Sequence, residues 1–236
     1  MLDERLAVGG SAEVWRAHPL SGELPAAHVA IKRLLTPVRG DSSARQMFSD
    51  EARLHKRLIH PNIVHCYEAG EERGEPFLVM ELVQGADLHR VSRLAQAQGR
   101  PLSAALACHI AREVLAGLAA VHDVRADDGR RLSMVHQDVS PSNIYLSNDG
   151  EVKLGDFGIA RADLNQTPRP TSTGTLRGKF AYMAPEQVAT ERVDHRADLF
   201  ALANVLSELL LAKPLFPGSG QLAVLLAIRD ARIEAL

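Results

Sequence analysis

The sequence has the length and composition of an ordinary globular domain. Its 236 residues are 46% apolar and 24% charged, and 27 basic against 29 acidic side chains leave a net charge of −2. This balance lacks the basic excess of nucleic-acid-binding proteins, so no nucleic-acid partner is expected. The charged first residues and the absence of an unbroken apolar run of membrane length predict no signal peptide and no membrane segment. The two cysteines form no metal-binding or disulfide pattern, and we expect a reducing, cytoplasmic compartment.

The first 80 residues contain short apolar runs typical of β-strands, with one helix among them. Residues 29–31 and 77–80 are such runs. Between them, apolar residues from Met47 to Leu58 recur at helical spacing, and Pro61 is expected to end the helix. This part is therefore predicted to be a small sheet with a single helix.

Beyond residue 85 the pattern becomes helical, and the boundary between the two parts is expected at 83–85. Ser103 is a candidate N-cap for a long helix. The predicted apolar face of this helix consists of Leu106, Ile110, Val114, Leu118 and Val121.

The remainder of the chain alternates between short strands, loops and helices. Strand-like runs lie around Ile144 and Val152, and a long loop rich in Thr, Pro and Arg covers 162–178. Helices return from Pro185, and the most apolar of them is expected over 194–211. These elements predict an α+β fold in which the helices follow the sheet.

Two features near the N-terminus suggest phosphate binding. The segment 6–14 is rich in small residues, whose backbone N–H groups can approach a phosphate closely, although a plain β-hairpin turn explains it equally well. Lys32 ends the next strand-like run, and Glu51 on the following helix is placed to orient its ammonium group. Taken singly, each of these two charges is more often a surface charge.

Three motifs in a fixed order decide the interpretation. They are His-Gln-Asp at 136–138 followed by Asn143, then Asp-Phe-Gly at 156–158, then Ala-Pro-Glu at 184–186. In this order and at these separations they resemble the protein kinase catalytic domain over essentially the whole chain, and bacterial Ser/Thr kinases in particular. Asp198 resembles the family's buried helix residue that supports the catalytic loop.

The resemblance implies the two-lobed α+β protein kinase fold. It predicts a β-rich N-lobe with one helix at about 1–82, a hinge at about 81–85 and a helical C-lobe at about 86–236. The C-lobe is expected to lack its last helices, because the family pattern continues beyond the point where this sequence stops.

The activity implied by the resemblance is transfer of the ATP γ-phosphoryl group to Ser or Thr hydroxyls of a protein substrate, with Mg²⁺ as the second cofactor. Asp138 would accept the proton of the substrate hydroxyl. Lys32, oriented by Glu51, would bind the α- and β-phosphates. Asn143 and Asp156 would be the metal ligands, since hard oxygen donors suit Mg²⁺.

The resemblance also places the nucleotide. Adenine would lie between apolar side chains of both lobes, behind Met80 as the gatekeeper, and would hydrogen-bond to backbone groups of Glu81 and Val83. Asp87 would meet the ribose. The implied nucleotide-binding residues are Leu6, Val8, Gly9, Gly10, Val14, Ala30, Lys32, Met80, Glu81, Val83, Asp87 and Tyr145.

Two positions have exchanged residue types relative to the family. Ser140 stands where Ser/Thr kinases carry Lys, and Lys179 stands where they carry Thr. Because one ammonium and one hydroxyl are retained, we expect Lys179 to reach toward Asp138 and the γ-phosphate, with Ser140 as its hydroxyl partner. The alternative is that Lys179 points to solvent and Ser140 is passive.

Other departures concern regulation and packing. Gln137 replaces an Arg that in many kinases pairs with a phosphorylated loop, so phosphorylation at 171–175 is expected to matter less. His55 and Cys66 fall where the family stacks apolar side chains, and Tyr145 is bulkier than the aliphatic residue expected under adenine.

Two other functions stay open at this point. A truncated pseudokinase, acting as a nucleotide- or partner-binding regulatory module, is favoured by the expected loss of the last helices. The retained motif residues argue against it. A small-molecule kinase of related fold is disfavoured, because Ala-Pro-Glu and the long loop before it belong to kinases with peptide substrates.

Overall fold

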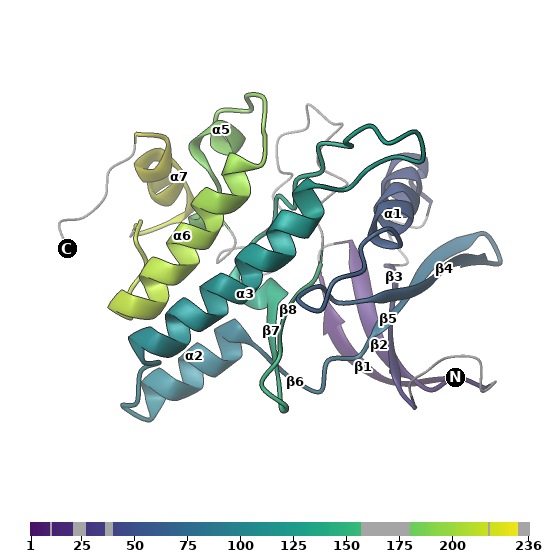
Figure 1. The fold of residues 1–236 in the computed structure, drawn as a ribbon, viewed down its shortest axis with the longest axis horizontal. Helices are drawn as coiled ribbons and strands as arrows, with labels where there is room; N and C mark the ends of the chain where they lie inside the picture. The colour runs from purple at the N-terminus through teal and green to yellow at the C-terminus, as the bar shows by residue number, and fades with distance from the viewer. Residues whose placement is uncertain (10, 21–26, 36–39, 157–179, 217, 231–236) are drawn as a thin grey trace.

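A β-rich part and a helical part make up the chain (Figure 1). They meet where β5 (Glu75–Glu81) ends and β6 (Gly85–Asp87) begins. This is the α+β arrangement expected from the sequence. The computed structural model describes residues 1–9, 11–20, 27–35, 40–156, 180–216 and 218–230.

The first part is a five-stranded antiparallel sheet in the order β1-β2-β3-β5-β4. The small-residue segment includes the end of β1 and the start of β2, which pair antiparallel. Helix α1 packs on one face of the sheet (Figure 1), and its N-cap Asp41 accepts a hydrogen bond from Ser43 N–H at 2.9 Å. The other elements of this part are β1 (Leu2–Val8), β2 (Ala12–Ala17), β3 (Val29–Leu34), α1 (Ser42–His55) and β4 (Cys66–Glu72).

Helix α1 ends at His55, earlier than the predicted stop at Pro61. Leu58 therefore lies in the following turn, where its buried side chain packs with Ile63. The imidazole of His55 is fully buried, and its Nε2 donates a hydrogen bond to the Val64 carbonyl at 2.8 Å. This buried polar contact ties the end of α1 to the start of β4, and burial lowers the pKa of His55 to about 4.

The segment before β4 is bonded to the helical part. Val64 N–H donates to the Leu154 carbonyl and Leu154 N–H donates to the Asn62 carbonyl, both at 2.9 Å. The Asn62 amide also donates to the Glu113 carboxylate at 2.8 Å. A Cβ on Gly117 would lie 2.9 Å from the Asn62 carbonyl oxygen, so helix and loop can approach this closely only because that residue is glycine.

The helical part is built around α3 (Ala104–His122), which lies beside α6 (Arg196–Leu211) in Figure 1. The expected N-cap is confirmed, because Ser103 Oγ accepts a hydrogen bond from Leu106 N–H at 3.3 Å. Four of the five predicted face residues are buried, but Leu106 is 39% exposed. Ala107 takes the inward position in that turn, since it lies three residues before Ile110 on the buried stripe.

By length and composition α3 could cross a membrane, with a mean hydropathy of 1.5. The core helix of a globular protein passes the same test, so this finding does not overturn the expectation of no membrane segment. In this structure the buried side of α3 packs against α6 and β8 (Val152–Leu154).

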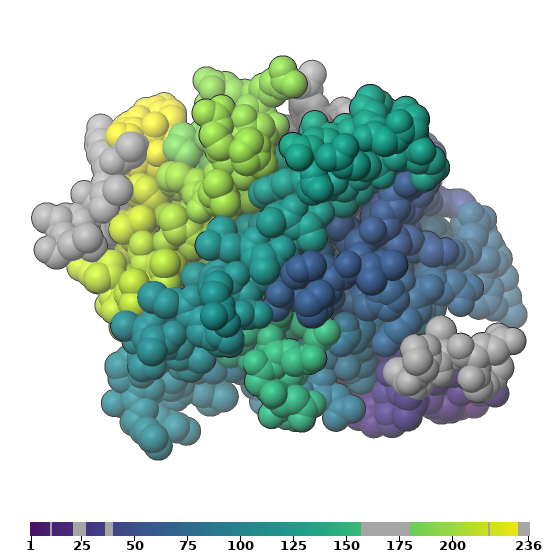
Figure 2. Space-filling view, viewed as in Figure 1, coloured from purple at the N-terminus to yellow at the C-terminus, as the bar shows by residue number. Residues whose placement is uncertain are grey.

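A second, three-stranded sheet of β6, β7 (Ile144–Ser147) and β8 lies where the two parts meet. Figure 2 shows its turn, in green, between the teal helices and the blue sheet. Both strands predicted around Ile144 and Val152 are present. The remaining helices are α2 (Leu88–Ala97), η2 (Pro141–Asn143), η4 (Phe180–Tyr182), α5 (Pro185–Val188) and α7 (Gln221–Arg229).

The pairing of β6 with β7 predicts a steric effect at Gly85. A Cβ there would lie 1.9 Å from the Leu146 carbonyl oxygen, so Gly85→Ala must separate the strands. We expect a loss of about 1–3 kcal/mol in unfolding free energy and a Tm lower by roughly 2–10 °C, measured by circular dichroism. Gly40→Ala is the matched control, because a Cβ there has no neighbour within 4 Å. Equal Tm values for the two variants would contradict the pairing.

The buried imidazole of His55 predicts a pH-dependent stability. Between pH 6.5 and about 4 the unfolded chain binds a proton at His55 that the folded chain does not, so stability falls as the pH falls through this window. The shift corresponds to about 3 kcal/mol. His55→Gln keeps a donor for Val64 but does not titrate, so its urea unfolding free energy should decline less from pH 7 to pH 4.

The control is the exposed His89, for which His89→Gln should retain the wild-type pH slope. Parallel slopes for wild type and His55→Gln would show that His55 binds a proton as readily in the folded chain as in the unfolded chain, and would contradict the prediction.

Candidate active site

A buried ion pair joins the sheet to α1. The Lys32 ammonium, on β3, lies 2.7 Å from the Glu51 carboxylate on α1, and 3.3 Å from Oδ1 of Asp156. Burial alone would lower the pKa of Lys32, but the two carboxylates raise it above its ordinary value, so the ammonium keeps its proton. The structure thus brings together a cation and two anions that the sequence places 19 and more than 100 residues apart.

The loop that carries His136 and Asp138 is anchored by hydrogen bonds to Asp198 on α6. This carboxylate is 1% exposed and accepts hydrogen bonds from the backbone N–H groups of His136 and Gln137, each at 2.8 Å. His122, at the end of α3, lies 2.7 Å from the same carboxylate. Gln137 has a φ of 63°, a conformation unusual for a residue with a side chain, and these hydrogen bonds stabilise it.

Asn143 is oriented by Asp138. Its amide nitrogen donates to the Asp138 carbonyl at 2.7 Å and to the Asp138 carboxylate at 2.9 Å. Because the nitrogen faces Asp138, the amide oxygen is turned away from it, as a cation ligand requires. Asn143 Nδ2 also lies 3.5 Å from the Asp156 carbonyl, so the two expected metal ligands are neighbours.

The buried His136 connects the loop to the segment that ends in Asp156. Its Nε2 donates to the Gly155 carbonyl at 3.2 Å, and its Nδ1 accepts from Asp138 N–H at 3.3 Å. These two roles require the neutral ring, and burial lowers the pKa of His136 accordingly. One imidazole therefore positions both Asp138 and Asp156.

Both oxygens of the Asp156 carboxylate have partners. Oδ1 faces Lys32, and Oδ2 accepts a hydrogen bond from the Tyr145 hydroxyl at 2.9 Å. The backbone of Asp156 is left-handed, with a φ of 55°. The hydrogen bond from Tyr145 could not be foreseen from motif spacing, because the family places an aliphatic side chain at that position.

Several of the expected adenine neighbours lie in one apolar cluster. Ala30 and Met80 are buried in it, and Val14, Val83 and Tyr145 pack against it. The residues come from β2, β3, β5, β7 and the connection after β5.

Other expected nucleotide residues have additional roles in the fold. Glu81 N–H donates to the His65 carbonyl at 2.8 Å, and its carboxylate pairs with Lys153 at 3.0 Å. Asp87 is the N-cap of α2 and accepts from Arg90 N–H at 2.8 Å. Within the hairpin, Leu6 and Val8 are exposed, and Gly9 N–H donates to the Ala12 carbonyl at 2.7 Å.

Part of the expected site is outside the described residues. Ser140 is described and is 2% exposed, with its Oγ 3.0 Å from that of Ser142. Gly10, Phe157, Gly158, Lys179 and the loop residues 171–175 lie outside the described part of the chain.

The donor set fits Mg²⁺. Asp156 and Asn143 offer one carboxylate and one amide oxygen from adjacent segments, and Mg²⁺ in phosphate-binding sites commonly uses one or two protein oxygens besides phosphate and water. Among the described residues there is no cluster of three or more His, Cys, Asp or Glu side chains that could hold a metal by themselves. The two protein oxygens therefore fit a Mg²⁺ ion whose remaining ligands would come from nucleotide phosphates and water.

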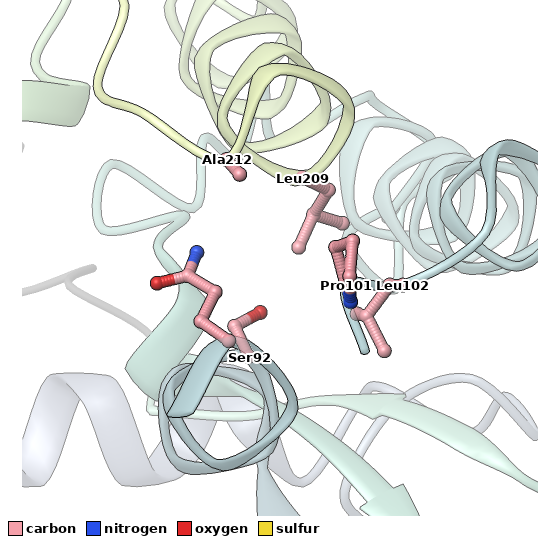
Figure 3. Close-up of a pocket in the computed structure, with 6 residues that line it drawn as sticks. Ser92, Pro101, Leu102, Leu209 and Ala212 are labelled. Atoms are coloured by element: carbon pink, nitrogen blue, oxygen red, sulfur yellow. The ribbon is translucent and has the colours of Figure 1, made fainter. Parts of the chain in front are cut away.

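A pocket elsewhere in the helical part does not belong to this site. It lies between α2 and the end of α6 (Figure 3) and has room for about one water molecule. No charged side chain lines it, and Ser92 Oγ is buried without a hydrogen-bond partner among the described residues. Its lining residues are Ser92, Gln96, Pro101, Leu102, Leu209 and Ala212.

Comparison with known proteins identifies the family. The protein kinase domain profile matches residues 3–235. The tyrosine-protein kinase MasK of Myxococcus xanthus is 38% identical over 234 residues, which are 99% of this chain and 36% of that protein. The serine/threonine-protein kinase PknL of Mycobacterium tuberculosis is 35% identical over 233 residues, which are 99% of this chain and 54% of PknL.

A third relative, the serine/threonine-protein kinase PknH of Mycobacterium bovis, is 36% identical over 213 residues, covering 90% of this chain and 33% of PknH. The chain thus spans between about a third and about half of the length of these relatives. With a profile match over nearly its whole length, the chain belongs to the protein kinase domain family.

Proposed function

We propose that this chain is an ATP- and Mg²⁺-dependent protein kinase that phosphorylates Ser or Thr residues of a protein substrate. The observation that carries the proposal is the contact of Lys32 with both Glu51 and Asp156. It is supported by relatives named serine/threonine-protein kinases. The site is divided between an N-lobe at about 1–82 and a C-lobe from about 86, with the hinge at about 81–85, and it works in the cytoplasm, where ATP is supplied.

The residues divide the work of positioning and charge stabilisation. Lys32, kept protonated and oriented by Glu51, binds the α- and β-phosphate oxygens. Asp138 orients the substrate hydroxyl and accepts its proton during transfer. Asn143 and Asp156 hold Mg²⁺, which when bound neutralises charge on the β- and γ-phosphate oxygens.

The adenine subsite is the apolar cluster around Ala30 and Met80. Because Glu81 N–H is already bonded to His65, adenine uses the Glu81 carbonyl and the Val83 N–H. Asp87 keeps its role as N-cap while its second oxygen meets the ribose. The hairpin residues Leu6, Val8, Gly9 and Gly10 cover the phosphates.

One observation favours a second specificity. MasK is named a tyrosine kinase and is similar to this chain over nearly its whole length. Transfer to Tyr is therefore the alternative outcome that the assay must separate from transfer to Ser or Thr. The regulatory binding module considered from the sequence is not favoured, since Lys32, Asp138, Asn143 and Asp156 are all retained and in mutual contact.

The proposed roles predict a loss of transfer in three variants. Lys32→Met, Asp138→Asn and Asp156→Ala should each lower phosphorylation of a generic basic protein, with labelled ATP and Mg²⁺, by about 10² or more, because each removes preorganised charge. The matched controls Lys213→Met and Asp149→Asn change exposed residues away from the site and should retain activity. Near-normal turnover of Asp138→Asn would contradict the kinase assignment, and phosphoamino-acid analysis identifies the acceptor residue.

The exchange of residue types at 140 and 179 predicts a coupled pair. We expect Lys179→Thr alone to reduce transfer strongly, because under this hypothesis Lys179 supplies the positive charge that the family's Lys supplies from position 140. Adding Ser140→Lys should restore much of the activity, since Ser140 lies on the same loop, two residues from Asp138, and can return the charge. Full activity of Lys179→Thr, or a double variant no better than the single one, would rule out the exchange.

A further inference from the structure

Tyr145 makes a contact that adenine packing does not explain. It lies on β7, and its side chain lines the apolar cluster assigned to adenine. Its hydroxyl nevertheless extends to Asp156 and donates to Oδ2 at 2.9 Å. Since Lys32 faces the other oxygen at 3.3 Å, the Asp156 carboxylate is held on both sides by different groups.

The position of the Tyr145 ring is determined by its surroundings. A Cβ on Gly155 would lie 3.1 Å from Tyr145 Cε2 and 2.9 Å from Val64 Cγ2, so the ring occupies space left by the missing side chain of Gly155. Across the small sheet, β7 pairs Tyr145 with Asp87 of β6. The Tyr145 ring thus packs beside Gly155, the residue that precedes Asp156.

The Tyr145 hydroxyl is the donor in its contact with Asp156, because a carboxylate can only accept. The charge of Asp156, burial and the charge of Asp87 all raise the pKa of Tyr145 well above its ordinary value. The Tyr145 side chain is partly buried, and a carboxylate is the strongest acceptor that a side chain offers its hydroxyl. A phenylalanine or leucine would fill the same space without this bond.

We propose that Tyr145 is a positioning residue whose hydroxyl sets the orientation of the Asp156 carboxylate for a metal ion, while its ring forms the floor of the adenine subsite. This inference rests on the proposed function, because it assumes that Asp156 binds Mg²⁺. Residues that hold a metal-binding carboxylate typically change metal affinity by 10–100-fold when they are removed. One side chain therefore couples metal binding to nucleotide binding.

The coupling is tested by calorimetry on the full chain. Tyr145→Phe keeps the ring and removes the hydroxyl, so the apparent Kd for Mg²⁺ at a fixed ADP concentration should rise about tenfold, whereas ADP binding without metal should stay at the wild-type level. Tyr145→Leu removes the ring as well and should weaken both. Tyr67→Phe is the matched control, because Tyr67 lies on β4 with its ring against His65 and outside the site.

A spectroscopic measurement reports the contact without metal or activity. The chain has three tyrosines, so ¹³Cζ-tyrosine labelling gives three signals. Asp156→Asn should shift the signal assigned by Tyr145→Phe and leave the other two in place. If Asp156→Asn moved none of the three signals, the inference would be overturned, even if Tyr145→Phe failed to fold and left the signals unassigned.

The outcomes separate this inference from the proposed function. Unchanged Mg²⁺ affinity of folded Tyr145→Phe, with normal Mg²⁺–ADP binding by wild type, overturns the role of Tyr145 and leaves the kinase proposal standing. A folded wild-type chain that neither binds Mg²⁺–ADP nor transfers phosphate overturns both.

Discussion

The buried carboxylate of Asp198 is the group on which the geometry of the loop that carries Asp138 depends. A fully buried charge is costly unless donors surround it, and here two backbone N–H groups and the His122 side chain do so. In return, the loop is held in the left-handed conformation at Gln137 that turns Asp138 toward Asn143. Removal of the carboxylate would leave buried donors and a strained turn unsupported at once.

From this point a continuous set of polar contacts crosses the molecule. His136, whose N–H is held by Asp198, bonds to Gly155 and so places Asp156. Asp156 meets Lys32, and Lys32 meets Glu51 on α1. Every member of this set is buried or partly buried, so each contact is little screened by solvent. The fold alone therefore fixes the relative positions of Asp138, Asp156, Lys32 and Glu51.

Motif order predicted which residues meet, because Lys32, Glu51, Asp138, Asn143 and Asp156 keep the family's types and separations. Features that depend on three-dimensional packing were not predictable in this way. Leu106 was assigned to the buried face of α3, but the helix phase gives that position to Ala107. The early end of α1 follows from the buried bond of His55 to Val64, which periodicity does not show.

The same limit applies inside the site. The hydroxyl of Tyr145 was predicted only as added bulk beneath adenine, since a sequence shows the size of a side chain but not the carboxylate that it reaches. The contribution of His122 was also missed, because one polar residue at the end of an apolar helix carries no distinctive signal. Motif patterns thus predict which parts of the backbone come together. They do not predict additional side-chain contacts such as those of Tyr145 with Asp156 and of His122 with Asp198.

The attachment of residues 62–64 to the helical part has a mechanical consequence. These residues precede β4 in the sequence, yet their hydrogen bonds go to Leu154 and to Glu113 on α3. The bidentate contact of Arg57 with Asp127, at 2.8 and 3.2 Å, adds a link just before them. If the five-stranded sheet rotates relative to the helical part to admit or release a ligand, we expect residues 62–64 to stay with the helices and to form the axis of the rotation. In such a rotation the His55 end of α1, which lies near the axis, would move less than the Ser42 end.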